Sequence, residues 1–213
     1  GPWGVFSYIL SLAVLFTIAA DIGLAAVLTR EIIKDPSNDA QYLSSSLFLK
    51  AILLAGSALI IVFVTPFITN LKLSSTLLIF IALLVVFDNL RIYANALNRA
   101  LEKMHLEAFI NIITQIFIVT LGMLVLYTRP SVENLAIVYL VGSAVGTIYA
   151  FWTIRAYFHK LFVKLDRGII KKILSAAWPF ALLGILGVVM LNTDIIMLGW
   201  MRAAEEIGYY SSA

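Results

Sequence analysis

The sequence predicts an all-α membrane protein with six transmembrane helices, and three observations carry that prediction. The 213 residues are 62% hydrophobic and 13% charged, whereas soluble domains average about 45–50% apolar and about 25% charged residues. The mean hydropathy is +1.00. Apolar stretches long enough to cross a bilayer follow one another along the chain. We place them at about 3–28, 44–69, 76–98, 106–128, 133–156 and 174–200.

Composition also excludes several classes of protein. The chain has no cysteine, which excludes disulfides and thiolate metal sites. Its formal net charge is only +3, so we expect no binding to nucleic acid. His105 and His159 lie at a span edge and in a basic loop, and we interpret them as solvated residues of the membrane interface. No metal and no cofactor are expected.

Lysine and arginine set the expected orientation, because cytoplasmic loops of membrane proteins carry an excess of these residues. One side of the predicted membrane carries Lys72, Arg129 and Arg202. The other side carries ten basic residues, so we place it in the cytoplasm and the N-terminus of the chain outside. These ten are Arg30, Lys34, Arg99, Lys103, Arg155, Lys160, Lys164, Arg167, Lys171 and Lys172.

The first two stretches each carry a charged residue. Residues 3–28 are too long for a secretory signal and lack its basic leading region, so we interpret them as a span. Two interpretations of Asp21 stay open: an acid that reaches water near the inner interface, or an acid that lines a cavity. In the second stretch, the stem of Lys50 is expected to snorkel to the inner headgroups, and Pro66 to end or kink the helix.

The third stretch is the most informative about function, because its charged residues lie within a predicted membrane span. Asp88 and Arg91 are followed by Asn95, Asn98 and Glu102 at spacings that put all five on one helical face. Charged side chains at membrane depth face a bundle interior or a wet cavity, and they pair where they can. We therefore predict a hydrated polar interior lined by this helix, and with it a transporter.

The fourth and fifth stretches carry weaker signals. Asn111 and Gln115 either join helices by hydrogen bonds or bind a substrate. The fifth stretch contains Gly142 and Gly146 in a small-xxx-small pattern, which predicts close packing of two helices.

The last stretch is preceded by an amphipathic segment. Residues 168–177 predict a short helix that lies on the cytoplasmic membrane face. Pro179 then opens the sixth span, where proline is tolerated in the first turn. Asp194 adds an acid to the outer half of this span.

A short internal repeat relates the two ends of the chain. Residues 4–8 and 208–211 both read glycine, an apolar or aromatic residue, an aromatic residue and serine. Each copy starts a span and six spans separate them, as in parallel repeats related by an axis along the membrane normal. We therefore expect the chain to be an internal piece of a protein with about twelve or more spans.

Several short motifs, in this order and spacing, resemble the polysaccharide and O-antigen (lipid-linked oligosaccharide) flippase family of the multidrug/oligosaccharidyl-lipid/polysaccharide exporter superfamily. They are GVFS at 4–7, ADIGL at 20–24, RALEKM at 99–104, WPF at 178–180, DIIMLG at 194–199 and GYYS at 208–211. The resemblance implies spans two to seven of a two-lobe transporter with twelve to fourteen helices. Residues 1–173 would hold five helices of the N-terminal lobe with its cytoplasmic basic linker, and 174–213 the first helix of the second lobe.

The resemblance also implies that the protein flips a polyprenyl-linked oligosaccharide from the inner to the outer leaflet of the cytoplasmic membrane by alternating access. Its partners are then this glycan lipid and the membrane lipids. The pyrophosphate of such a substrate needs a cation, and a guanidinium suits bidentate phosphate contact. Sugars need hydrogen-bonding groups. The expected substrate-binding residues are Arg91, Asp88, Asn95, Asn98, Asn111 and Gln115.

Ion coupling and a purely structural role are further hypotheses for the same acids. Asp21, Asp88 and Asp194 are the candidates to bind a coupling proton or sodium ion. Asp88 also has a second possible role, which is to hold Arg91 when the site is empty. The structural alternative is that Asp88 and Arg91 only neutralise each other so that the span inserts.

Two other functions remain open at this level. One is an ion-coupled drug or cation antiporter of the same superfamily, in which acids dominate and Arg91 is structural. The other is a membrane enzyme that handles polyprenyl phosphates. The close acid pair in a cytoplasmic loop, Asp35 and Asp39, reads more simply as a turn. Because no catalytic set, phosphate-cradling loop or metal-spaced cluster occurs in the sequence, we expect no enzyme.

Overall fold

The computed structural model describes residues 2–68, 74–163 and 165–201. Within these ranges every regular element is helical and no strand occurs, which confirms the all-α prediction. The elements are α1 (Pro2–Ala19), α2 (Leu24–Lys34), η1 (Pro36–Asn38), α3 (Asp39–Leu59), η2 (Ile60–Val64), α4 (Thr65–Ile68), α5 (Ser75–Ala100), α6 (Met104–Thr128), α7 (Val132–Thr153), η3 (Arg155–Tyr157), α8 (Phe158–Leu161) and α9 (Arg167–Met201).

Six helical segments are long and apolar enough to cross a membrane, as the sequence predicts. The shortest has 21 residues, which at about 1.5 Å per residue spans about 31 Å, close to the thickness of a bilayer core. The segments are 6–34, 36–67, 75–100, 104–128, 132–153 and 167–187.

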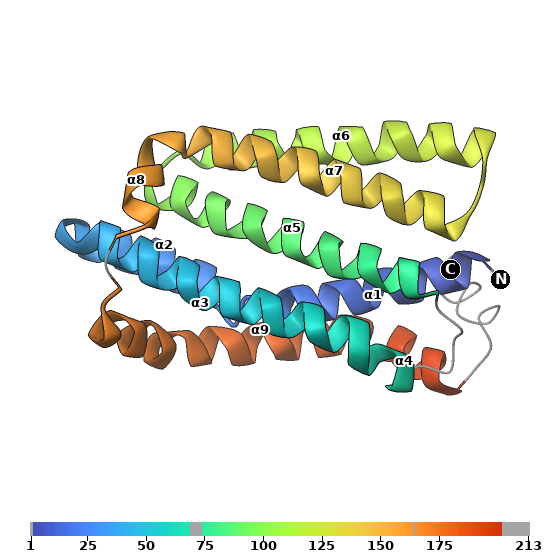
Figure 1. The fold of residues 1–213 in the computed structure, drawn as a ribbon, viewed down its shortest axis with the longest axis horizontal. Coiled ribbons are helices and arrows are strands. Elements are labelled where there is room, and N and C mark those ends of the chain that lie inside the picture. Colours follow the sequence, from blue (N-terminus) through green and yellow to red (C-terminus); the bar gives the residue numbers. More distant parts are fainter. Residues whose placement is uncertain (1, 69–73, 164, 202–213) are drawn as a thin grey trace.

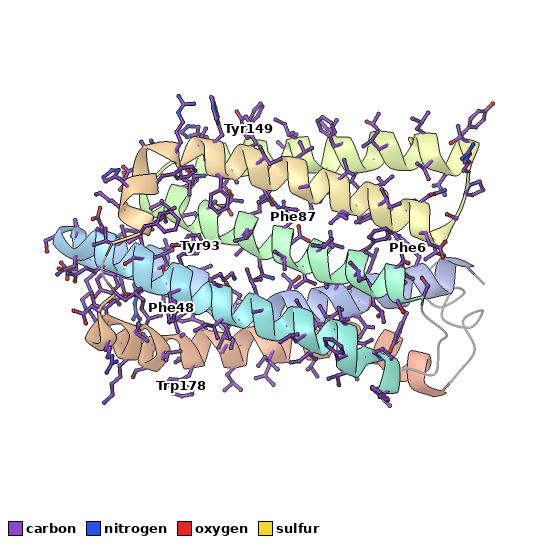
Figure 2. All side chains as sticks on the ribbon, viewed as in Figure 1. Phe6, Phe48, Phe87, Tyr93, Tyr149 and Trp178 are labelled. Atoms are coloured by element: carbon purple, nitrogen blue, oxygen red, sulfur yellow. The ribbon has the colours of Figure 1, made fainter. Side chains whose placement is uncertain are left out.

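The helices form one elongated bundle with α5 in its middle (Figure 1). α5 contacts α1, α2, α3, α6 and α7, whereas α9 packs against α1, α2 and α3. Figure 2 shows Tyr93 of α5 within the bundle and Trp178 of α9 at its edge. The Tyr93 hydroxyl is buried and donates a 2.8 Å hydrogen bond to the Leu43 carbonyl of α3. This bond fixes α5 against α3.

The first span is interrupted, which the sequence analysis did not foresee. α1 ends at Ala19 and α2 begins at Leu24, and between them Ile22 and Gly23 have φ values of 46° and 74°. Gly23 is required here because an added Cβ would lie 2.5 Å from the Cβ of Phe180 on α9. The break therefore lets α9 pack closely on the first span.

The prediction of a separate helix at residues 168–177 is wrong. α9 runs without a break from Arg167 to Met201 and contains Pro179 in its interior. The apolar side of the segment is covered by the bundle, because Ile173 and Ala177 are buried in the same core as α2 and α3. With 35 residues, α9 is about 52 Å long and exceeds a bilayer core of about 30 Å. Part of α9 must therefore extend beyond the apolar layer.

The second span changes its winding before Pro66. α3 passes into the π-turn Ile60–Val64 and then into α4, which contains Pro66. Proline has no N–H, and its ring clashes with the carbonyl four residues earlier. That carbonyl belongs to residue 62, inside the wider π-turn, so the irregularity predicted at Pro66 is accommodated one turn earlier.

The acidic segment between the first two spans is a turn, as predicted. Ser37 and Asn38 donate hydrogen bonds of 2.6 Å and 2.9 Å to the Asp35 carboxylate. These bonds stabilise the ionised form and lower the pKa of Asp35. Asp39 forms an ion pair with Lys160. Both acids thus have partners that shape the loop.

Candidate functional site

Arg91 forms a polar cluster with partners on three helices. Its guanidinium donates to Asp88 at 2.8 Å on the same helix, α5, and to Asn111 of α6 at 3.0 Å. The Ser143 hydroxyl of α7 donates to the same Asp88 oxygen at 2.6 Å. The side chains of Arg91 and Asp88 are only 15% and 27% exposed. This arrangement joins α5, α6 and α7.

Close helix packing surrounds this cluster. An added Cβ at Gly146 would collide with the Thr114 hydroxyl oxygen and lie 3.1 Å from the Cδ of Arg91. An added Cβ at Gly142 would collide with Ile118. The close packing predicted for the 142–146 segment is therefore confirmed: Gly146 lets α7 approach Arg91, and Gly142 lets α7 approach Ile118 of α6.

Lys50 forms a second polar cluster on the opposite side of α5. Its side chain is 0% exposed, and its Nζ lies 2.6 Å from Asp21 Oδ1 and 2.7 Å from Asn89 Oδ1. The prediction that Lys50 snorkels to headgroups is wrong, because the break after α1 supplies a carboxylate inside the bundle. A buried cation in a membrane protein needs such a partner.

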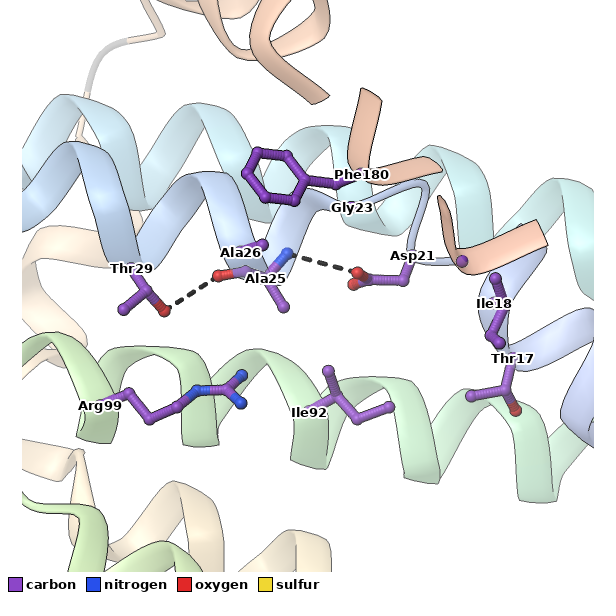
Figure 3. Close-up of a pocket in the computed structure, with 11 residues that line it drawn as sticks. Thr17, Ile18, Asp21, Gly23, Ala25, Ala26, Thr29, Ile92, Arg99 and Phe180 are labelled. Atoms are coloured by element: carbon purple, nitrogen blue, oxygen red, sulfur yellow. Dashed lines mark hydrogen bonds between the residues drawn. The ribbon is translucent and has the colours of Figure 1, made fainter. Parts of the chain in front are cut away.

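A cavity of about 490 Å³ lies between the α1–α2 break, α5 and α9 (Figure 3). Asp21 and Thr29 line one wall, Arg99 of α5 lies opposite, and the Phe180 ring of α9 closes one side. Small-ligand sites have volumes of about 300–1,000 Å³. Asp21 thus lines a cavity and at the same time neutralises Lys50.

Arg99 is a lining residue that sequence reasoning missed, because it was counted only as a basic loop residue. It lies in the last turn of α5, and its side chain extends along the cavity toward Ile92 in Figure 3. Its Nη1 lies 3.4 Å from Glu107 Oε1, longer than the about 2.7–2.9 Å of a charge-assisted hydrogen bond. This leaves N–H donors of Arg99 for a ligand. The available signal was its position directly after Asn98 and one helical turn after Asn95.

The other predicted site residues do not share one surface. Asn98 donates a 2.9 Å hydrogen bond to Thr153 of α7, and the buried Asn95 Oδ1 has no partner among the described residues. Gln115 is exposed on α6. The predicted five-residue face is wrong at its last member, because α5 ends at Ala100 and Glu102 has a φ of 58°.

A family model described as polysaccharide biosynthesis protein matches residues 2–213. The chain belongs to this family. No curated protein and no solved structure matches it. The family resemblance predicted from the sequence motifs is thereby confirmed. Membership and the six apolar helices support a multi-pass membrane protein with a role in polysaccharide export.

In this polysaccharide biosynthesis protein, coupling to a proton or sodium ion stays a prediction. Asp21 and Asp88 each have a basic partner. The Asp194 side chain and the second repeat copy near residue 208 lie outside the described residues. In the part of the chain that the structure describes, no group of three or more His, Cys, Asp or Glu side chains is arranged to hold a metal ion.

A third polar cluster ties α9 to the rest of this family member, at the end that carries the basic loops. The Glu31 carboxylate of α2 is buried and accepts from Lys172 of α9 at 2.9 Å and from Arg30 at 2.8 Å. Lys172 also donates to the Tyr42 hydroxyl of α3. α9 is therefore held at this end by an ion pair and farther along by the Gly23–Phe180 contact.

Proposed function

We propose that this protein is a transporter, not an enzyme, that moves a polyprenyl-linked oligosaccharide from the inner to the outer leaflet of the cytoplasmic membrane. One observation carries the proposal: within the bundle of a polysaccharide biosynthesis family member, a cavity presents both Arg99 and Asp21. The pyrophosphate and sugars of such a lipid cannot cross hydrocarbon unaided, whereas its tail can stay in the lipid. A cavity in the bundle that presents a cation and a carboxylate meets that need.

In this proposal Arg99, not Arg91, receives the phosphate. Arg91 already contacts Asp88 and Asn111, and neither Arg91 nor Asp88 lines the cavity. A guanidinium carries five N–H donors, and the long contact with Glu107 engages Arg99 only weakly. The Asp88–Arg91 pair then has the structural role of joining α5 to α6 and α7.

Alternating access is proposed to occur by movement of α9 away from the break after α1. α9 forms one wall of the cavity through Phe180 and Gly184, so its displacement opens the cavity on that side. α9 packs along α1, α2 and α3, so this movement must separate apolar contacts. It must also break the Lys172–Glu31 ion pair and the close approach at Gly23.

The test is a leaflet assay with the full-length protein in vesicles. A fluorescent polyprenyl-pyrophosphate oligosaccharide is placed in both leaflets, and a membrane-impermeant quencher reports the outer fraction over time. We expect wild-type protein to move the lipid and Arg99→Gln to lose at least about ten-fold of the rate, as for removal of a charged hydrogen-bonding group. Arg129→Gln, an exposed arginine outside the cavity, is the matched control. A wild-type rate equal to that of protein-free vesicles would overturn the proposal.

A further inference from the structure

We propose that the cavity holds the sugar-phosphate unit at the lipid end of the glycan, with the phosphate on Arg99, the first sugar ring against Phe180 and hydroxyls of that sugar on Asp21. The inference rests on the proposed function and names the part of the substrate that the cavity takes. It is carried by the arrangement of three side chains with different chemistry around one space (Figure 3).

The size of the cavity limits what enters. Its volume of about 490 Å³ is in the range of sites for small ligands, so a phosphate with an attached sugar fits, whereas a long oligosaccharide chain cannot be held as a whole. Gly23, Ala25 and Ala26 supply the wall near Phe180. Gly23 has no side chain and the two alanines carry only a methyl group, which leaves the space that a sugar ring requires. The remaining sugars then extend out of the cavity.

The two ends of the cavity differ in charge, which sets the direction of the ligand. Ile92 and Arg99 both line it from α5, and seven residues of helix separate them by about 10 Å. Arg99 lies at one end in Figure 3 and Asp21 toward the other. A phosphate is attracted to the guanidinium and repelled by the carboxylate, so it binds at the Arg99 end.

Asp21 is prepared to accept hydrogen bonds from hydroxyl groups. Its Oδ1 is engaged by Lys50 at 2.6 Å, whereas its Oδ2 has only a long 3.4 Å contact from the Ala25 N–H. An ionised carboxylate is an acceptor only, and sugar hydroxyls are donors. Thr29 donates to the carbonyls of Ala25 and Ala96, so the lone pairs of its oxygen add a second acceptor.

Phe180 supplies an apolar surface of fixed position. Its Cβ would lie 2.5 Å from a Cβ added at Gly23, so the backbone of the break packs directly against the start of this side chain. In Figure 3 the ring lies at the cavity wall beside Gly23. The C–H groups of one face of a pyranose ring pack on the negative face of an aromatic ring. A bare phosphate gains nothing from this surface, so Phe180 distinguishes the glycosylated lipid from the bare one.

The experiment measures binding of two short-chain lipids to the full-length protein: a polyprenyl pyrophosphate that carries one hexose, and the same lipid without the sugar. We expect Phe180→Leu to weaken binding of the hexose lipid by about three- to ten-fold, the size of an aromatic packing contribution, and to leave the bare lipid unchanged. Arg99→Gln should weaken both lipids by a similar factor. Phe117→Leu, on the exposed side of α6, should weaken neither.

The role of Asp21 is tested without mutating it, because its replacement leaves the buried Lys50 without a carboxylate. Monodeoxy analogues of the hexose lipid are titrated against wild-type protein, and we expect at least one to bind about ten-fold more weakly. Equal effects of Phe180→Leu on both lipids, or equal binding of all deoxy analogues, would overturn the inference. The leaflet assay keeps the two proposals apart: if wild-type protein moves its substrate while Phe180→Leu is neutral, the inference fails and the transporter proposal stands.

Discussion

Lys50 and Arg91 are two cations inside one helical bundle, and they meet the same requirement in different ways. Each contacts one aspartate and one asparagine. Arg91 finds its carboxylate three residues away on its own helix and stays partly exposed. Lys50 is fully buried, and its carboxylate lies 29 residues away at a helix break.

The comparison shows that an ion pair within one helix and an ion pair between distant segments have different structural roles. Asp88–Arg91 neutralises charge within one helix and also fastens neighbouring helices. Asp21–Lys50 fixes the position of an irregular segment that lines the cavity. Asp88 and Asn89 are adjacent on α5, yet they belong to the two separate clusters. α5 thus separates a packing side from a cavity side, and four substitutions test that separation.

The largest effect is expected for Asp21→Asn, which leaves the buried Lys50 without a carboxylate. Breaking a buried ion pair by removing one partner costs about 3–5 kcal/mol. Thermal unfolding of the purified full-length protein should report a correspondingly large loss of stability. The double variant Asp21→Asn/Lys50→Met should recover most of it, because no charge then remains buried. If the single variant stays within about 1 kcal/mol of wild type, Lys50 does not depend on Asp21.

A smaller loss is expected for Asp88→Asn. Arg91 then keeps Asn111 as a partner and retains some access to solvent. Removing one partner of a hydrogen-bonded charged group costs about 1–3 kcal/mol. The same thermal unfolding measurement serves for comparison with Asp21→Asn. Equal losses for the two variants would remove the distinction between the clusters.

Gly146→Ala tests whether close helix packing stabilises the Arg91 cluster. The new methyl group would collide with Thr114 and press on Arg91, and overpacking costs about 1–3 kcal/mol. Gly56→Ala is the matched control, since nothing lies within 4 Å of its added Cβ. Because alanine is the better helix former, the control should gain up to about 1 kcal/mol. Losses of similar size in both variants would show that helix propensity, not packing, sets the effect.

The smallest effect is expected for Ser143→Ala, which removes one of the hydrogen bonds to Asp88 and should cost about 1 kcal/mol. Thr128→Ala serves as reference, because that hydroxyl is exposed and donates to the carbonyl of Leu124 in its own helix. Its change should stay within about 0.5 kcal/mol. Indistinguishable unfolding temperatures for the two variants would show that the Ser143 hydrogen bond does not stabilise the packing of α7 on the Arg91 cluster.

The features that were predicted correctly depend on local sequence patterns. Six runs of apolar residues predict six spans, and the spacing of Gly142 and Gly146 predicts a close approach of helices. The Asp35–Asp39 turn follows from its proline and its hydrogen-bonding side chains. Each of these depends on residues within a few positions of one another.

The features that were missed depend on distant segments. A run of apolar residues predicts one span whether or not it contains a residue in the left-handed conformation. The break at Gly23 could therefore not be predicted without knowing that Phe180 of α9 packs against it. Lys50 lies close to a span end in the sequence, and only the fold shows that its side chain is buried against Asp21. Arg99 lines the cavity because the fold brings residues of α2 and α9 to the other sides of the same space. No local sequence pattern predicts that arrangement.

The central claim is that the cavity beside α9, and not the Arg91 cluster, carries the substrate. The most direct measurement is the leaflet assay on Arg99→Gln and Arg91→Gln, with rates normalised to the folded protein. The account predicts at least a ten-fold loss for Arg99→Gln at unchanged unfolding temperature, and a near wild-type rate for folded Arg91→Gln despite a lowered unfolding temperature. Loss of transport in Arg91→Gln with full activity in Arg99→Gln would contradict it.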